Sequence, residues 1–192
     1  ADLGFAHERL RQTYPRLILI SISGYSELGP YAKRKAYDLL IQAEAGLASV
    51  TGSPDMPSRV GVSVVDIATG MNAYEAALEA LILRERTGQG ADIRLSMFDA
   101  IADWSTVPLL QHEGGKTPRR LGLAHPSIAP YGVFQTQDGV DILISIQNDR
   151  EWHVFTHSVI EDDDLAGHPD FATNVQRVKL REYTDQKVQS AF

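Results

Sequence analysis

The hydrophobic positions of the first hundred residues follow two alternating patterns. Residues 16–23 form an almost unbroken apolar run, which predicts a strand covered on both faces, as in parallel α/β sheets. Residues 37–50 and 67–86 carry apolar side chains three and four positions apart, which predicts helices. A second strand over 91–97 and a helix over 99–111 continue the alternation. Alternating strands and helices indicate a layered α/β domain.

The longest of these predicted helices has a continuous apolar face. We expect that face to be buried, and it comprises Ile67, Met71, Tyr74, Leu78, Leu81 and Ile82. A parallel sheet of two or three strands is too small to cover both faces of the first strand. The chain therefore looks incomplete as a folding unit, and either a partner or further chain supplies the rest.

The pattern changes after residue 113. Residues 114–120 are rich in Gly, Pro and Arg, which is typical of a hinge. Apolar runs at 131–136 and 140–146 flank an Asp-Gly pair, a strong hairpin signal, and helical stretches follow from 149 and 174. We therefore predict part of a large α/β domain over 1–100, a linker helix and hinge over 101–120, and part of a small α+β domain over 121–192.

Composition and charge narrow the classes of function. The 192 residues carry a net charge of −7, so the overall field disfavours nucleic acid and anionic membranes as partners. The chain has no Cys, which excludes disulfides, thiolate metal ligation and a cysteine nucleophile. No secretion signal or membrane-spanning run is visible, and the six scattered His residues give no metal set, so we expect a cytoplasmic protein without a metal.

Asp66 is the first candidate for chemistry. It follows a predicted extended stretch over 59–65 and precedes the helix over 67–86. A carboxylate at a helix N-terminus accepts free backbone N–H groups and stays ionised, which suits a nucleophile. A purely structural helix cap is the alternative that position alone favours.

Two loops are further candidates. The loop over 23–31 leaves the carboxyl end of a strand, where ligands bind in parallel sheets, and the cations Lys33, Arg34 and Lys35 follow it. These cations could neutralise a phosphate, or they could simply be a solvated basic segment. The loop over 125–132 has two prolines and a glycine, which predicts either a rigid pocket wall or an ordinary loop. No Gly-x-Ser-x-Gly elbow supports a serine hydrolase.

Several short motifs follow one another along the chain, and they begin at Ser21, Gly29, Lys35, Gly46, Thr51, Arg59, Asp66, Arg86, Met97 and His125. In this collinear order they resemble the class III CoA-transferases, the family of formyl-CoA transferase, carnitine CoA-transferase and α-methylacyl-CoA racemase. The resemblance spans essentially the whole chain, and its 35–40 and 147–152 segments are similar to the mesaconyl-CoA C1–C4 transferase branch.

This resemblance implies a fold and a set of partners. Family members have a Rossmann-like large domain and a smaller domain, and two subunits interlock as a homodimer. Their substrates are an acyl-CoA, with coenzyme A as the carrier, and a carboxylic acid. The chain would be the middle part of such a protein.

The resemblance also assigns residues. Asp66 aligns with the catalytic aspartate, and Lys35 and Met97 align with positions that contact CoA; Arg34 belongs to the same basic cluster. Tyr37 and Asp38 match positions that line the acyl pocket, and the adjoining strand-end loop contributes Gly24 and Tyr25 to the substrate site.

Two alternatives remain open. Racemases of the family carry His where this chain has Tyr37, and tyrosine, with an ordinary pKa of about 10, is a poor base for moving an α-proton. A CoA-transferase is therefore favoured over a racemase. The third interpretation is a non-catalytic CoA-binding or dimerisation fragment.

Overall fold

A computed structural model describes residues 5–192 of the chain. These residues form two compact units, which divide between Arg120 and Leu121. Each unit has its own hydrophobic cluster and is described by itself.

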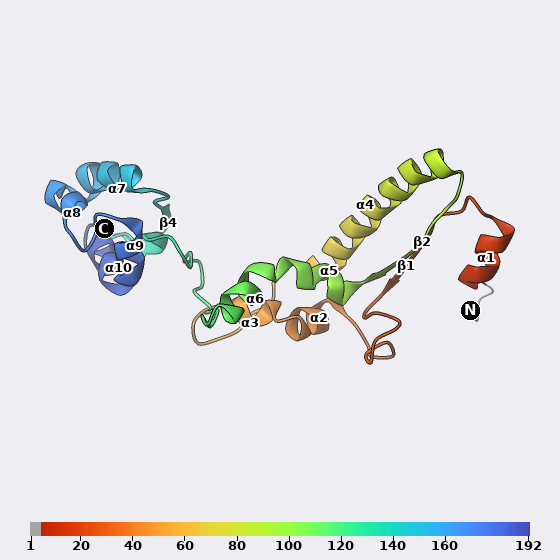
Figure 1. The fold of residues 1–192 in the computed structure, drawn as a ribbon. Coiled ribbons are helices and arrows are strands. Elements are labelled where there is room, and N and C mark those ends of the chain that lie inside the picture. Colours follow the sequence, from red (N-terminus) through yellow and green to blue (C-terminus); the bar gives the residue numbers. More distant parts are fainter. Residues whose placement is uncertain (1–4) are drawn as a thin grey trace. The chain divides into compact units, whose positions relative to one another are not determined.

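A two-stranded parallel sheet is the centre of the first unit. Strands β1 (Leu19–Ser23) and β2 (Asp92–Ser96) pair in register from Leu19 opposite Asp92 to Ser23 opposite Ser96. The long helix α4 (Val64–Thr87) lies against both strands, as Figure 1 shows. The prediction of two parallel strands separated by a long helix is confirmed.

Shorter helices complete the first unit, and two of the predicted helices are broken. They are α1 (His7–Thr13), α2 (Asp38–Glu44), α3 (Leu47–Val50), α5 (Met97–Trp104) and α6 (Thr106–Glu113). The single helix expected over 37–50 is wrong, because Gly46 adopts a left-handed φ of 82° and ends α2. The helix expected over 99–111 also breaks, at Ser105, and Pro108 then occupies the first turn of α6, where its missing N–H costs nothing.

The core of the first unit lies where α2, α4 and α5 meet the end of β1. Its buried members are Tyr25, Ile41, Val64, Val65, Ala68 and Ile101, with Ala36, Met97 and Phe98 among those packed around them. Gly24 permits this packing, because a Cβ atom there would lie 2.0 Å from Cβ of Ala36. Any side chain at position 24 would push the 31–37 segment away from the end of β1.

The apolar face of α4 is exposed, so the prediction that it is buried was wrong for this chain. Its exposed fractions run from 39 % at Leu81 to 66 % at Tyr74. The residues that α4 does bury are mostly small, and they are Val64, Val65, Ala68, Thr69 and Ala80. Two strands offer too little surface to cover the larger side chains.

The segment over 101–120 is tied to the first unit. It contains the end of α5 and all of α6, and Arg120 then donates hydrogen bonds to the carbonyls of Ser49, Ser53 and Pro54 at 3.0–3.1 Å. These three bonds attach the expected hinge to α3 and to the loop that follows it.

The second unit is a hairpin covered by helices. Strands β3 (Tyr131–Gln135) and β4 (Asp141–Ser145) pair antiparallel across the Asp138–Gly139 turn, which confirms the predicted hairpin. The helices are α7 (Asp149–Phe155), which continues as a π-helix over Thr156–Ile160, α8 (Asp163–Gly167), α9 (Asn174–Lys179) and α10 (Arg181–Gln189). Trp152, Phe171 and Val188 are at most 2 % exposed at the centre of this unit.

Among residues 5–192, no helix combines the length and apolar character needed to cross a bilayer.

Candidate functional site

Asp66 lies in the first turn of α4 rather than before it. The extended stretch expected to run through Val65 is wrong, because Val64 and Val65 are already helical and Ser63 is the residue that precedes the helix. The side chain of Asp66 is exposed, while Val65 on its N-terminal side is fully buried. The buried valine anchors the turn, and the positive end of a 24-residue helix favours a negative charge on Asp66.

Asp38 fixes the start of α4. Its Oδ1 accepts a hydrogen bond from the backbone N–H of Val65 at 2.8 Å, and its Oδ2 accepts one from Nε2 of Gln42 at 2.7 Å. Gln42 is itself fully buried, and its Oε1 accepts the N–H of Val60 at 2.8 Å. The two side chains therefore hold both ends of the segment that leads into Asp66.

Sequence reasoning missed Gln42. The available signal is a polar residue among the apolar residues of the 37–50 stretch, since a buried amide in such a run must find partners. The sequence analysis also assigned Asp38 to the acyl pocket. In the structure both carboxylate oxygens of Asp38 accept hydrogen bonds from groups of the same chain. In this structure Asp38 supports the residue next to Asp66.

The other predicted site residues border the same hydrophobic cluster. Ala36 packs against the cluster and lies between Lys35 and Tyr37, and Met97, the first residue of α5, packs there as well. Tyr37 is 69 % exposed in the extended segment just before α2. One cluster thus brings Lys35, Tyr37 and Met97 close to the start of α4.

Gly24 and Tyr25 belong to the interior of this region. The carbonyl of Gly24 accepts the N–H of Phe98 at 3.1 Å, which ties the end of β1 to α5. Tyr25 is 7 % exposed, and its ring packs against those of Tyr31 and Phe98. The phenol of Tyr25 is a core group here, so its assignment to the substrate site rests on the loop position alone.

The three cations of the basic segment differ in their surroundings. Nη1 of Arg34 lies 2.7 Å from Oε1 of Glu44, and the guanidinium stacks 4.2 Å above the ring centre of Tyr31. The hydrogen bond and charge of Glu44 raise the pKa of Arg34 above its ordinary value. Within residues 5–192 no carboxylate pairs with Lys33 or Lys35, so these two ammonium groups are the ones open to a ligand. All three precede α2, which begins at Asp38, so they lie outside its first turn.

A Ser–His–Asp arrangement joins α1 to the sheet. Nδ1 of His7 lies 2.6 Å from Oδ1 of Asp92, and Nε2 of His7 lies 2.8 Å from Oγ of Ser21. The distances match those of a hydrolase triad. Ser21, however, lies mid-strand opposite Arg94, where the backbone serves the β-ladder and not an oxyanion hole. We therefore interpret the three side chains as a polar tie that holds α1 on the sheet.

The contact between His7 and Asp92 predicts that the free energy of unfolding depends on pH. Burial opposes ionisation of Asp92, but the hydrogen bond and charge of His7, together with Arg94, outweigh it and lower the pKa of Asp92 below its ordinary value. A lowered folded-state pKa adds stability above the unfolded pKa near 4, and that stability is lost as the pH falls through the folded value. We expect Asp92→Asn to lower the unfolding free energy by about 1 kcal/mol at pH 7, and by progressively less as the pH falls below the unfolded pKa of Asp92. Urea unfolding over a series of pH values measures this, and a loss that does not shrink at acidic pH would contradict it.

The described region has no metal-ligand group, and a cavity lies in the second unit. Among residues 5–192, no three His, Asp or Glu side chains are grouped as metal ligands. A cavity of about 530 Å³ lies in the second unit along α7, lined in part by Asn148, Arg150 and Val154. None of the predicted site residues lines this cavity.

Comparison with known proteins gives the family. The profile described as CoA-transferase family III matches residues 1–192. The acetyl-CoA:oxalate CoA-transferase of Acetobacter aceti is 41% identical over 184 residues, which cover 92% of this chain and 46% of that protein. The succinate–glutarate CoA-transferase of Agrobacterium fabrum is 36% identical over 187 residues, which cover 93% of this chain and 44% of that protein.

A solved structure agrees with this result. The crystal structure of a CAIB/BAIF family protein from Brucella suis matches 99% of this chain and 50% of that chain, with a TM-score of 0.80 and 35% identity. The chain belongs to the class III CoA-transferase family. It spans about half the length of the relatives it matches.

Proposed function

We propose that the full-length protein moves coenzyme A from an acyl-CoA to a free carboxylic acid, with Asp66 as the nucleophile. The observation that carries the proposal is the placement of Asp66: exposed, in the first turn of α4, with the preceding residue fixed by Asp38. Family membership supplies the reaction class. The two strands and α4 are consistent with one part of a Rossmann-like large domain.

The proposed reaction has four balanced steps. The carboxylate of Asp66 attacks the thioester carbonyl and expels CoA as a thiolate, which leaves an aspartyl-acyl anhydride. The thiolate then attacks the aspartyl carbonyl, which releases the donor acid and leaves an aspartyl-CoA thioester. The acceptor carboxylate attacks that thioester to form a new anhydride and thiolate, and the thiolate finally attacks the acceptor acyl carbon. The new acyl-CoA leaves, and Asp66 returns as a carboxylate.

Several groups of the first unit could serve these reaction steps. The N-terminus of α4 favours negative charge on Asp66 and can stabilise the oxyanion that forms as its carbonyl is attacked. Lys35 and Lys33 supply unpaired cations for the phosphates of CoA, while Arg34, already paired with Glu44, would contribute its charge less directly. Met97 supplies an apolar contact, Tyr37 would face the acyl group, and Asp38 positions the start of α4 through its two hydrogen bonds.

The test is direct transfer. Full-length protein is incubated with succinyl-CoA and isotopically labelled oxalate, glutarate or mesaconate, and labelled acyl-CoA is followed by mass spectrometry. Formation of labelled product that depends on the acceptor acid supports the proposal. Exchange of an α-hydrogen of a 2-methylacyl-CoA with deuterated water, without an acceptor, would support the racemase alternative. If the protein binds CoA but catalyses neither reaction, the non-catalytic role is supported.

We also propose that the full-length protein is a homodimer and that the apolar face of α4 contributes to its interface. Tyr74 and Leu78 on that face are 66 % and 42 % exposed in this chain. Six large apolar side chains along one helix face form a patch of the kind that marks an interface.

Charges on this face are expected to separate the subunits. We expect the double variant Tyr74→Asp, Leu78→Asp to weaken dimerisation at least 100-fold, because two carboxylates would be buried without partners. Light scattering after size exclusion measures the mass, and Glu79→Gln, which changes an exposed acid of α4 outside the six-residue apolar face, is the control. A variant that stays dimeric but unfolds more easily would show that the face packs within one subunit instead.

A further inference from the structure

The cavity of about 530 Å³ in the second unit lies between the end of β4, α7 and the π-helix that follows α7. Its apolar lining consists of Ile146, Val154, Phe155 and Val159. Ile146 and Phe155 are buried, whereas Val154 and Val159 are 59 % and 41 % exposed. Small-molecule sites have volumes of about 300–1,000 Å³ and mainly apolar linings. The cavity therefore has the size and surface to hold a small ligand with an apolar part.

The π-helix over Thr156–Ile160 shapes one wall of this cavity. In a regular α-helix, a residue and the fifth residue after it point about 140° apart. Each turn of a π-helix contains an additional residue, so Val159 can line the same cavity as Val154 and Ser158. Glu161, directly after the π-helix, has a left-handed φ of 58°, which is uncommon for a residue with a side chain. Since π-helical turns are frequent at functional sites, this irregular segment is a second indication of a binding site.

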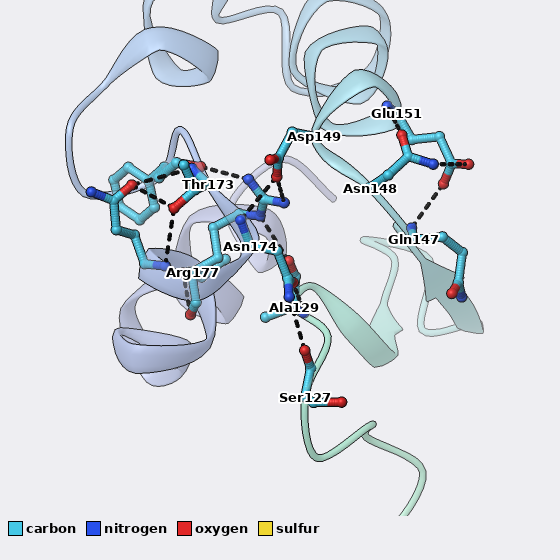
Figure 2. Close-up of polar contacts among 12 residues, drawn as sticks. Ser127, Ala129, Gln147, Asn148, Asp149, Glu151, Thr173, Asn174 and Arg177 are labelled. Carbon is cyan, nitrogen blue, oxygen red and sulfur yellow. Dashed lines mark hydrogen bonds and ion pairs between the residues drawn. The ribbon is translucent and has the colours of Figure 1, made fainter.

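Two of the polar residues that line the cavity bind each other. Oδ1 of Asn148 accepts the N–H of Glu151 at 2.9 Å, and its Nδ2 donates to Oε1 of Glu151 at 2.9 Å. Oε2 of Glu151 accepts the N–H of Gln147 at 2.8 Å, as Figure 2 shows. Both carboxylate oxygens of Glu151 are thus engaged at the start of α7.

Arg150 is the charged lining residue that remains available. Its side chain is exposed, and none of the ion pairs within residues 5–192 involves it. A guanidinium can donate two parallel hydrogen bonds to a carboxylate. Ser158 adds a hydroxyl group to the same lining. The cavity therefore combines an apolar surface with one cation that lacks a partner.

We propose that this cavity binds a small aliphatic carboxylic acid in its ionised form. The carboxylate pairs with Arg150, and the hydrocarbon chain contacts Val154, Phe155 and Val159. The inference rests only on contacts of the second unit, and it does not depend on a catalytic role of Asp66. Each buried CH₂ group contributes about fourfold to affinity, and the charged hydrogen bonds contribute about 10-fold or more.

Methyl NMR of the full-length protein tests this proposal. The protein is labelled with ¹³C in its valine methyl groups, and sodium hexanoate is titrated. We expect saturable shifts at Val154 and Val159 and none at Val140, an exposed valine of the hairpin turn. Butyrate has two fewer CH₂ groups and should bind about 10-fold more weakly. Hexanamide, which is uncharged, should also bind at least 10-fold more weakly.

Two charge-removing variants provide a matched pair. Arg150→Gln should raise the Kd for hexanoate about 10-fold, as measured by the shifts of Val154 and Val159. Lys179→Gln removes another exposed cation of the second unit, outside the cavity, and should leave the Kd unchanged. Asp66→Asn should also leave it unchanged, so the inference can hold even if Asp66 is not the nucleophile.

Three results would overturn the proposal. The first is the absence of saturable shifts at Val154 and Val159, and the second is an equal affinity for hexanoate and hexanamide. The third uses a soluble nitroxide, which broadens methyl resonances that are open to solvent. If Val154 and Val159 are protected in the ligand-free protein while Val140 is broadened, another part of the protein or a second copy fills the cavity.

Discussion

Replacing Asp66 with asparagine is expected to reduce CoA transfer at least 1,000-fold while leaving the fold intact. Asparagine keeps the size of the side chain but cannot attack a thioester or form the anhydride. The exposed position of Asp66 means that no buried contact is lost. The loss should therefore appear in kcat, with the KM for acyl-CoA changed little.

The measurement combines kinetics with trapping of the intermediate. Mass spectrometry of full-length protein mixed with acyl-CoA should detect CoA attached to the peptide that contains Asp66, and this adduct should be missing from Asp66→Asn. Glu75→Gln, which changes another exposed acid of α4, is the matched control and should retain both activity and adduct. If Asp66→Asn transfers CoA at an unaltered rate, the proposed mechanism is wrong.

Replacing Arg177 with alanine is expected to destabilise the second unit by about 3 kcal/mol. The change leaves the carbonyls of Ala129 and Phe171 without their donor and removes the pair with Asp149. It also opens a cavity beside Trp152, because Arg177 is fully buried. Half of the Asp149 side chain is exposed, so the ion pair itself contributes the smaller part.

Hydrogen exchange localises this effect in the full-length protein. Amides over residues 125–190 should exchange faster in Arg177→Ala, whereas those of α4 should not change. The exchange rates in Arg177→Lys should lie between those of Arg177→Ala and the unmodified protein, because a single ammonium group cannot replace a guanidinium that bonds three acceptors. Arg150→Ala is the control, since Arg150 is exposed, and it should stay within about 0.5 kcal/mol of the unmodified protein. Unchanged exchange in Arg177→Ala would contradict the structural role described here.

Local patterns predicted the regular elements well. The apolar run at 16–23 and the three-and-four spacing of 67–86 lead to β1 and α4, and the Asp138–Gly139 pair leads to the β3–β4 turn. Each of these signals is contained in a short window, where side-chain period and turn chemistry decide the backbone. Helix ends were predicted less well, because Gly46 and Ser105 break helices whose apolar spacing continues across them.

The candidate site was predicted only in outline. The motifs predicted that Asp66, Lys35 and Met97 share one region. In the structure Met97 packs against the cluster that also contains Val65 and Ala36, the chain neighbours of Asp66 and Lys35. Nothing in the local pattern showed that Asp38 binds the backbone of Val65, 27 positions away, or that Gln42 binds Val60. Such contacts depend on how α2 packs against α4, which no short window of sequence contains.

The sequence by itself determined the family, the order of strands and helices, and the acidic residue that we propose as the nucleophile, because these depend on residue identity and local period. Only the tertiary structure decided which polar groups meet. It paired Arg34 with Glu44, buried Tyr25 and left the face of α4 exposed. Hydrogen bonds act over about 3 Å, so their partners are fixed only once distant segments of the chain have packed together.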